Sequence, residues 1–532
     1  MSNNSSRQNG EYSGKHRTLE TRAGIRNGVK RLIFVLISFL LEIILFIVAF
    51  VGLHQYAGWI LIITRFAATI LILMICSQDR TASIKMFWIM IIMAVPVFGV
   101  FLYMMIGLNG YTRWMAKRYR KVDEQLLPLL KEDTKAEERL WEADPSGATL
   151  SNYLKKQAGY PLCEGTEVIY YPEAIQGLEA QLSDLSRAER FIFMEYHAIE
   201  DAESFHRIEE ILESKVKEGV EVRVFYDDMG SIGFITTDFV KRMRKKGIQC
   251  RVFNPVFPGL NLFLNNRDHR KITVIDGRIG YTGGYNIANE YFNITHPYGY
   301  WKDTGVRLMG PAVKNLTAAF LEMWNAVNIK HKDADHYDQY LPDQESSAES
   351  QGFVQPYADG PTVREHVAEN VYISIAESAV KYAWFVTPYL IITDEMKHVL
   401  CLAAKRGVDV RIITPGIPDK KLVYSVTRSF YSALAANGVR IYEYTHGFCH
   451  CKMSVSDDRI ATCGTINMDY RSLYHHFENG CVLYQNEAVM DLRKDFEEMY
   501  AVSNEVTREY SVGKSRFLRL WQLLLRIMAP LL

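Results

Sequence analysis

Three long apolar runs lie near the start of the chain, at 32–53, 58–76 and 86–108. Each is long enough to cross a bilayer, which needs about 20 apolar residues. We therefore predict a membrane region over 32–108 and a multi-pass protein of the cell membrane. The third run contains Pro96, so it either spans the bilayer or forms a re-entrant loop.

Each of the first two runs contains one charged residue, Glu42 or Arg65. If the chain turns near residue 53, the two side chains lie at the same depth and can pair, which makes charges tolerable in a membrane. In the alternative, one of these helices lies in the membrane interface. The polar segment 1–31 is predicted to be disordered. The basic residues of this segment and the basic run 113–121 both favour the cytoplasmic side of the membrane. We therefore expect the catalytic part on the cytoplasmic side.

Apolar strands alternate with amphipathic helices in the rest of the chain. Residues 109–160 read as a linker helix that Pro128 interrupts. Beyond it, the segments 190–199 and 220–228 are typical of buried strands, and 204–219 is typical of a helix that ends at a glycine. This alternation predicts an α/β fold in which helices flank a mixed sheet.

The order of elements occurs twice, at a spacing of about 180 residues. The segment "EGVEVRVF" at 218–225 returns as "RGVDVRII" at 406–413, and the strands before and after them also correspond. We therefore predict two duplicated lobes, at 161–330 and 353–512, joined by the polar linker 331–352. A site that uses both copies belongs at the edge that the lobes share.

Each lobe contains the same polar motif, H-x-K-x4-D-x6-G-x2-N. Its residues are His269, Lys271, Asp276, Gly283 and Asn286 in the first lobe and His450, Lys452, Asp457, Gly464 and Asn467 in the second. Because side chains alternate along a strand, the histidine and lysine of each copy share one face. Two copies in the same strand order indicate a functional site rather than a chance match.

The second motif is surrounded by Cys449, Cys451 and Cys463, so a zinc site that includes a histidine is an alternative. These cysteines lack C-x2-C spacing, and alternation turns Cys449 and Cys451 away from the face of His450. We therefore favour a core position for them and expect no metal and no cofactor. The eight cysteines of the chain do not form a disulfide framework.

Two histidines that face each other across a lobe interface can supply a nucleophile and a general acid/base. Lys271 and Lys452 add positive charge, and Asn286 and Asn467 add hydrogen-bond donors. This combination suits a phosphoryl centre, where cations and donors hold the non-bridging oxygens.

Carboxylates that orient the histidines are expected on later strands, and Asp303 and Glu478 occupy equivalent places after the two motifs. Glu195 is a further candidate for the site. Asp276 and Asp457 are catalytic candidates as members of the motif. Each lies seven residues after its histidine, on the opposite strand face, which favours a role in closing the turn.

The duplicated motif resembles that of the phospholipase D superfamily, and its bacterial cardiolipin synthase branch in particular. The similar features are the apolar N-terminal runs and the segments "DDMGSIG" (227–233), "NRDHRK" (266–271), "TPYL" (387–390), "NMDYRSL" (467–473) and the terminal "APLL". The resemblance implies a phosphatidyltransferase that makes cardiolipin and glycerol from two phosphatidylglycerols through a phosphohistidine, without a metal. By this resemblance His269 is the nucleophile and His450 the acid/base, although the near-symmetry leaves the order open. The run 32–53 departs from the family, which usually has two membrane segments.

Other functions share part of this pattern. A membrane phospholipase D or a phosphatidyltransferase with another headgroup acceptor has the same catalytic residues. A non-enzymatic membrane scaffold with a cysteine/histidine metal site is an alternative of another class. The balance of 61 basic and 61 acidic residues argues against a nuclease or another nucleic-acid binder.

The expected partners are phosphatidylglycerol and membrane lipids, and the sequence does not determine an oligomeric state. The apolar insert 254–266 is either a lipid-facing lip or a packed loop. The tail 513–532 mixes basic and apolar residues, as an interfacial helix or a core helix does.

Overall fold

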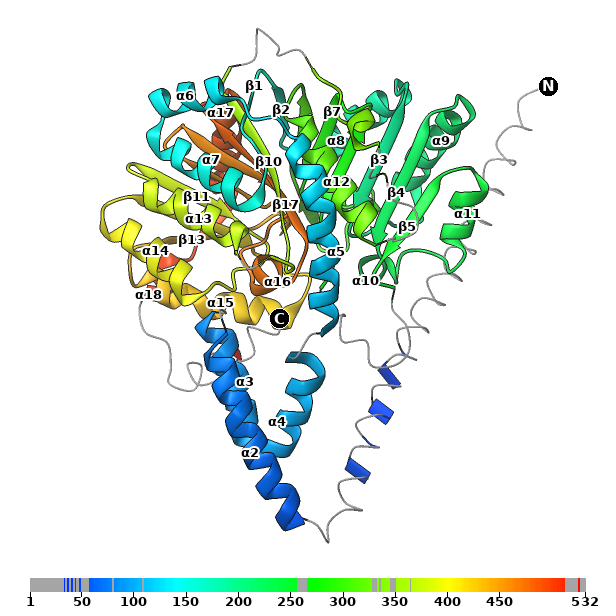
Figure 1. Cartoon of the computed structure of the whole chain (residues 1–532). Helices are drawn as coiled ribbons and strands as arrows, with labels where there is room; N and C mark the ends of the chain where they lie inside the picture. The colour runs from blue at the N-terminus through cyan, green and yellow to red at the C-terminus, as the bar shows by residue number, and fades with distance from the viewer. Residues whose placement is uncertain are drawn as a thin grey trace, which may run out of the picture.

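Two α/β lobes lie side by side, and a helical hairpin projects from them (Figure 1). In this computed structural model the described residues are 57–78, 81–107, 110–255, 266–327, 336–344, 351–363 and 365–511, with isolated positions between 33 and 48 and at 333, 525 and 526.

Each lobe is built on one mixed sheet. The first contains β2 (Glu167–Tyr171), β3 (Phe191–Tyr196), β4 (Glu221–Asp227), β5 (Gln249–Phe253), β6 (Lys271–Ile275), β7 (Ile279–Gly283) and β9 (Gly305–Met309). The second contains β1 (Cys163–Glu164), β10 (Phe353–Asp359), β11 (Tyr382–Val386), β12 (Asp409–Pro415), β13 (Arg440–Tyr444), β15 (Met453–Ser456), β16 (Ile460–Gly464), β17 (Glu478–Tyr484) and β18 (Ser503–Glu505).

The strand orders confirm the duplication. The first sheet runs β2-β9-β7-β6-β3-β4-β5, and the second runs β10-β17-β16-β15-β11-β12-β13 between the added edge strands β1 and β18. In both sheets the first strand of the parallel trio pairs antiparallel with the strand that follows the motif histidine, as β3 does with β6 and β11 with β15. The polar motif therefore occupies the same place in each lobe.

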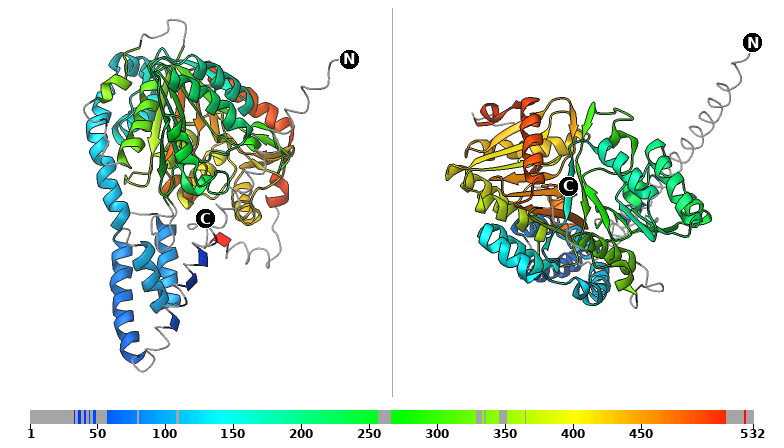
Figure 2. Two further views of the ribbon diagram at one scale, coloured as in Figure 1. Left: turned by 90° about the vertical axis from the view of Figure 1, so that its right-hand side faces the viewer. Right: turned by 90° about the horizontal axis from the view of Figure 1, so that it is seen from above.

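Helices cover the sheets and connect the lobes. They are α5 (Gly110–Leu126), α6 (Thr134–Ala143), α7 (Pro145–Ala158), α8 (Ala174–Ser186), α9 (Glu203–Lys217), α10 (Asp228–Ser231), α11 (Phe239–Lys245), α12 (Val313–Ala326), α13 (Val367–Ser378), α14 (Asp394–Lys405), α15 (Lys421–Ala435), α16 (Tyr470–Tyr474), α17 (Ala488–Ala501) and α18 (Thr507–Ser511). Figure 2 shows the two sheets side by side when the molecule is seen from above.

One hydrophobic core runs through both lobes. It contains Phe193 and Phe320 of the first lobe, Phe385 and Phe477 of the second, and Tyr119 of α5. The rings of Tyr119 and Phe477 stack with centroids 4.8 Å apart. The lobes are therefore packed as one body, because a shared core leaves no free surface between them.

The segment predicted as one linker helix at 109–160 is three helices. α5 ends at Leu126 before a short 3-10 turn that contains Pro128, and α6 and α7 follow it. α7 begins at Pro145, because proline fits the first turn of a helix but cannot continue one. The start of the predicted first lobe also needs correction, since Cys163–Glu164 pairs with β10 of the second sheet.

The projecting hairpin consists of α2 (Ala57–Cys76), α3 (Ala82–Ala94) and α4 (Pro96–Leu102). The run 86–108 is therefore not a single helix. α3 stops at Ala94 and α4 starts at Pro96, because proline has no N–H for the helical ladder. Within the described part of the chain, no helix is both long and apolar enough to cross a membrane.

Several predictions concern residues outside the described part. The segment 1–31 and the partner Glu42 lie outside it, and the run 32–53 is described only at isolated helical positions. Most of the linker 331–352, most of the insert 254–266 and most of the tail 513–532 also lie outside it. These expectations stay predictions.

Candidate active site

The motif histidines lie where the two lobes exchange backbone hydrogen bonds. The first-lobe strand β8 (Tyr300–Lys302) pairs in parallel with β14 (Gly447–Cys449) of the second lobe, and His450 N donates to Lys302 O at 2.8 Å. At the equivalent place Asp268 bridges to Phe477, and His269 N donates to Phe477 O at 2.8 Å. Each histidine is thus fixed on the edge of its own lobe by the backbone of the other.

The side chains repeat this crossing. His269 Nδ1 lies 2.9 Å from Glu478 Oε2 in the second lobe, and His450 Nδ1 lies 2.7 Å from Asp303 Oδ2 in the first. Both carboxylates are fully buried. A carboxylate accepts the Nδ1 proton, so this tautomer leaves the Nε2 lone pair as the atom that can attack. The expected contacts of Asp303 and Glu478 are confirmed, and they join the lobes.

His450 Nδ1 has a second neighbour, the ammonium of Lys452, whose Nζ lies 2.7 Å away. An ammonium has no lone pair and cannot accept the Nδ1 proton. Lys452 also donates to the carbonyl oxygen of its own His450. We therefore assign the Nδ1 proton to the bond with Asp303.

The motif glycines let the carboxylate strands approach. A Cβ on Gly464 would lie 2.6 Å from the carbonyl oxygen of Asn479, the residue after Glu478. A Cβ on Gly283 would likewise meet the carbonyl oxygen of Thr304, the residue after Asp303. Glycine at these two positions therefore allows each carboxylate to reach the edge where the histidines lie.

The two motif lysines are buried beside the histidines. Lys271 Nζ donates to the carbonyl oxygen of His269 at 2.8 Å, in the manner of Lys452 and His450. Burial lowers the pKa of Lys271 to about 7 and that of Lys452 to about 8, and Lys452 also lowers the pKa of Lys271. Burial, reinforced by these cations, holds the pKa of both histidines well below its usual value. Such a site favours an anion.

The two motif asparagines differ. Asn286 is occupied, since its Nδ2 donates to the Tyr291 hydroxyl at 2.8 Å and its Oδ1 accepts from Ala198 N at 3.1 Å. Among the described residues, Asn467 Oδ1 has no hydrogen-bond partner. An amide oxygen accepts and cannot hold a phosphate oxygen, so the role as a donor to substrate stays a prediction for both asparagines.

Asp276 and Asp457 lie at the far ends of β6 and β15. Each adopts a positive φ, 57° and 52°. The carboxylate of Asp276 accepts three backbone N–H groups, from residues 189–191, at 2.7 to 2.9 Å. Asp457 accepts the equivalent groups of residues 380–382, also at 2.7 to 2.9 Å. These contacts agree with the role in closing the turn that the strand face favoured, and a catalytic role for either aspartate stays a prediction.

Glu195 is fully buried on β3. Burial and the nearby Asp268 raise its pKa well above the usual value, and Arg270 opposes this shift. Neither carboxylate oxygen has a hydrogen-bond partner among the described residues. Glu195 therefore belongs to a charged cluster behind the motif and not to the face of the histidines.

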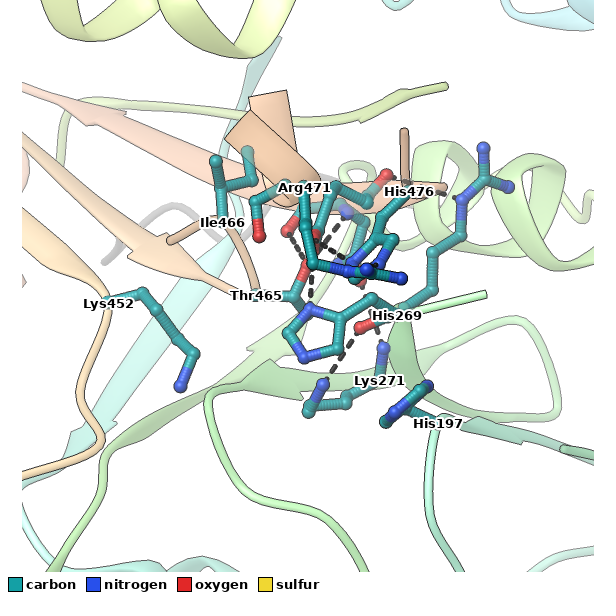
Figure 3. Close-up of polar contacts among 12 residues, drawn as sticks. His197, His269, Lys271, Lys452, Thr465, Ile466, Arg471 and His476 are labelled. Carbon is teal, nitrogen blue, oxygen red and sulfur yellow. Dashed lines mark hydrogen bonds and ion pairs between the residues drawn. The ribbon is translucent and has the colours of Figure 1, made fainter. Parts of the chain in front are cut away.

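Three neighbours of His269 were missed from the sequence. The ring of His197 lies 5.0 Å from that of His269, and the ring of His476 lies 5.5 Å from it. His476 Nε2 accepts from Arg471 Nε at 3.2 Å. Figure 3 shows Arg471 and His476 above the His269 ring and Lys271 and His197 below it. His476 stands two residues before Glu478, which is the signal that could have found it.

Two groups of described residues have metal-ligand atoms within 4.8 Å of one another: His269, His476 and Glu478; and Asp201, His206 and Glu209. In the first group the nearby cations Lys271 and Arg471 oppose a metal ion. In the second, Asp201 and Glu209 are already paired with Arg242 or Lys246.

The cysteines of the zinc alternative belong to neither group. Cys449, Cys451 and Cys463 lie in the hydrophobic core, as strand alternation predicted.

Comparisons with known proteins agree with this geometry. The family described as cardiolipin synthase, PLD-like domain, matches residues 182–324 and 372–500, and the family described as phospholipase D-nuclease N-terminal matches 66–107. The chain belongs to the cardiolipin synthase family of phospholipase D-like proteins. As a member of this family it is an enzyme of the phosphatidyltransferase class.

Relatives of the chain are similar over most of its length. A cardiolipin synthase 2 of Bacillus cereus is 33% identical over 86% of this chain and 88% of its own. A cardiolipin synthase of Alkalihalophilus pseudofirmus is 34% identical over 86% and 90%. An uncharacterized protein of Streptococcus mutans is 40% identical over 86% and 98%.

Among solved structures, the phosphatidylserine synthase of Haemophilus influenzae is similar in fold. Its TM-score is 0.53 at 14% identity, and the match covers 72% of this chain and 97% of that one.

Proposed function

We propose that the enzyme transfers a phosphatidyl group from one phosphatidylglycerol to another, giving cardiolipin and glycerol through a phosphohistidine intermediate. The observation that carries this proposal is the pair of crossed imidazole–carboxylate contacts, His269 with Glu478 and His450 with Asp303. The names of the cardiolipin synthase relatives support the choice of substrate.

In the first half of the reaction, the Nε2 lone pair of His269 attacks phosphorus and forms an N–P bond. The P–O bond to glycerol breaks, and the leaving oxygen takes a proton from Nε2 of His450, which enters this step as an imidazolium protonated on both nitrogens and paired with Asp303. Lys271 and Lys452 offset the negative charge that gathers on the non-bridging oxygens.

In the second half, a hydroxyl of another phosphatidylglycerol replaces the departed glycerol. His450, now neutral, removes the hydroxyl proton while the oxygen attacks phosphorus. The N–P bond breaks and restores His269. If water replaces the second lipid, the product is phosphatidic acid.

We also propose that the α2–α4 hairpin is embedded in the membrane. Ile63, Phe66, Leu73 and Met93 are large apolar residues of this hairpin and are 65% to 71% exposed. A patch of this kind marks an interaction site with a partner or a lipid surface. Attachment there would keep the site at the interface, where phospholipid headgroups lie.

The test uses the purified full chain in detergent with labelled phosphatidylglycerol, beside His269→Ala and His450→Ala. Cardiolipin and glycerol are expected from the wild type alone, and a chelator is expected to leave the rate unchanged. Phosphatidic acid as the sole product would replace the transferase with a hydrolase. Full activity in either histidine variant would refute the mechanism.

A further inference from the structure

The environments of the two catalytic histidines differ at one matched position. His476 stands two residues before Glu478, and Trp301 stands two residues before Asp303. The ring of His476 lies 5.5 Å from that of His269, and the ring of Trp301 lies 5.4 Å from that of His450. The fold is thus symmetric here while the chemistry is not.

The contacts of His476 fix its tautomer. An arginine guanidinium can only donate, so the 3.2 Å contact from Arg471 Nε makes His476 Nε2 an acceptor. Burial and the nearby Arg471 hold the pKa of His476 well below its usual value, so the ring is neutral. Its one proton therefore sits on Nδ1. Backbone bonds hold the same loop, since His476 N donates to Arg471 O at 2.8 Å.

His476 Nδ1 faces the carboxylate oxygen of Glu478 that has no other hydrogen bond. Glu478 Oε2 accepts from His269 Nδ1 and from the Thr465 hydroxyl. Its Oε1 has no hydrogen-bond partner among the described residues, and His476 Nδ1 lies 3.6 Å from it. Catalytic contacts of this length often tighten when substrate binds. Arg471, His476, Glu478 and His269 then form one chain that begins with a cation.

The matched position in the other half cannot build such a chain. An indole has one N–H and no lone pair, so Trp301 cannot accept from an arginine. Four residues after each motif asparagine the chain has Arg471 in one lobe and Glu290 in the other. The cation that donates to His476 thus has an acid, Glu290, at the matched position of the first lobe.

We propose that His476, held by Arg471, is a positioning residue that keeps Glu478 directed at His269, and that it thereby makes His269 the nucleophile. The inference rests on the proposed transferase function. An imidazole that bonds to phosphorus gains positive charge, and a carboxylate that stays ionised stabilises it. The partner histidine must instead take up and release a proton. Burial raises the pKa of its carboxylate, Asp303, to about 7, which suits that role.

The test compares His476→Ala with His476→Asn, because an asparagine amide can place an N–H near the position of Nδ1. In His476→Ala we expect kcat to fall about 10- to 100-fold, the range typical for loss of an outer partner, with KM within about twofold of wild type. His476→Asn should restore kcat.

The nucleophile is located with a phosphatidyl ester of nitrophenol, which needs no acid to leave. In His450→Ala the phosphatidyl adduct should accumulate on His269, as mapped by mass spectrometry. His206→Ala, at a histidine paired with Asp201 outside the site, is the control and should leave the rate of adduct formation unchanged. If His476→Ala does not fold, Arg471→Met removes the donor to His476 and should lower kcat without raising KM.

An adduct on His450 in a parallel sample of His269→Ala, or equal kcat in wild type, His476→Ala and His476→Asn, would overturn the inference while leaving the transferase intact. Equal losses in the two His476 variants would reduce His476 to a packing residue and also overturn it. If the wild type transfers no phosphatidyl group, the proposed function fails as well.

Discussion

The role of a residue in this site depends on which end of a strand it occupies. His269 precedes β6 and Asp276 follows it, so one motif contributes both to the histidine edge and to the turn at the opposite end. The second copy repeats this arrangement on β15. The histidines and the aspartates can therefore be separated by experiment.

Replacement of Asp457 by alanine should lower stability and not catalysis. The variant loses the acceptor of three backbone N–H groups, and we expect the free energy of unfolding to fall by roughly 2–4 kcal/mol. Urea unfolding measures this change, and kcat per folded molecule should stay within about twofold of wild type. Lys452→Met should instead lower kcat and leave the free energy of unfolding close to that of wild type. A large loss of kcat in folded Asp457→Ala would return the aspartate to the catalytic set.

Substrate affinity should weaken with rising pH. The pKa of Lys271 is about 7 and that of Lys452 about 8, both lowered by burial, so each lysine is a cation only below these values. As pH rises through 7 to 8 the site loses positive charge and KM should increase. Lys452→Arg stays charged throughout and should flatten the upper part of this rise. A KM that does not change between pH 6 and pH 9 would contradict the assignment.

At the scale of elements, the order of strands and helices along the chain and the two candidate carboxylates were readable from the sequence, because periodicity and duplication indicate both. The contacts between the lobes were not readable from the sequence. A linear pattern does not say whether Asp303 or Glu478 reaches the histidine of its own lobe or that of the other lobe. The two-residue strand β1 was assigned to the wrong lobe, because two residues are too few to show a periodicity. His476 was missed although it stands two residues before the candidate Glu478, because a single histidine outside the repeated motif is more often structural than functional.

The close approach of β16 and β17 gives an element-scale prediction. A Cβ at Gly464 would press on the backbone of residues 479 and 480, so Gly464→Ala should lower the free energy of unfolding by about 1–3 kcal/mol. It should also lower kcat, because Glu478 begins β17. Gly233→Ala is the control, since a Cβ there meets nothing within 4 Å. Unfolding and kcat should be measured on both variants, and equal behaviour would refute the packing argument.

At the scale of the molecule, the helical hairpin and the catalytic body meet different surroundings. The hairpin exposes large apolar side chains, whereas the body buries its apolar residues in a shared core. The apolar runs were visible in the composition, and their membrane role stays a prediction. The break between α3 and α4 at Pro96 follows from proline chemistry, although residues 86–108 form one continuous apolar run in the sequence.

Charge placed on the hairpin should release the protein from membranes. We expect Phe66→Lys combined with Leu73→Lys to move the full chain from the membrane fraction to the soluble or aggregated fraction, because burying an ammonium in lipid is unfavourable. Sedimentation of cell lysates measures this change. Val380→Lys, at a residue 74% exposed on the body, should leave the distribution unchanged. Equal sedimentation of all three proteins would argue against membrane insertion of α2.

The crossed contacts also bear on how such a molecule could arise. A single unduplicated half would contain a histidine and a carboxylate that meet only when two copies associate, so it could work only as a pair of identical chains. In such a pair every substitution alters both halves at once. Joining the copies in one polypeptide lets each half change alone, and His476 opposite Trp301 is a difference of the kind that only a fused chain can keep.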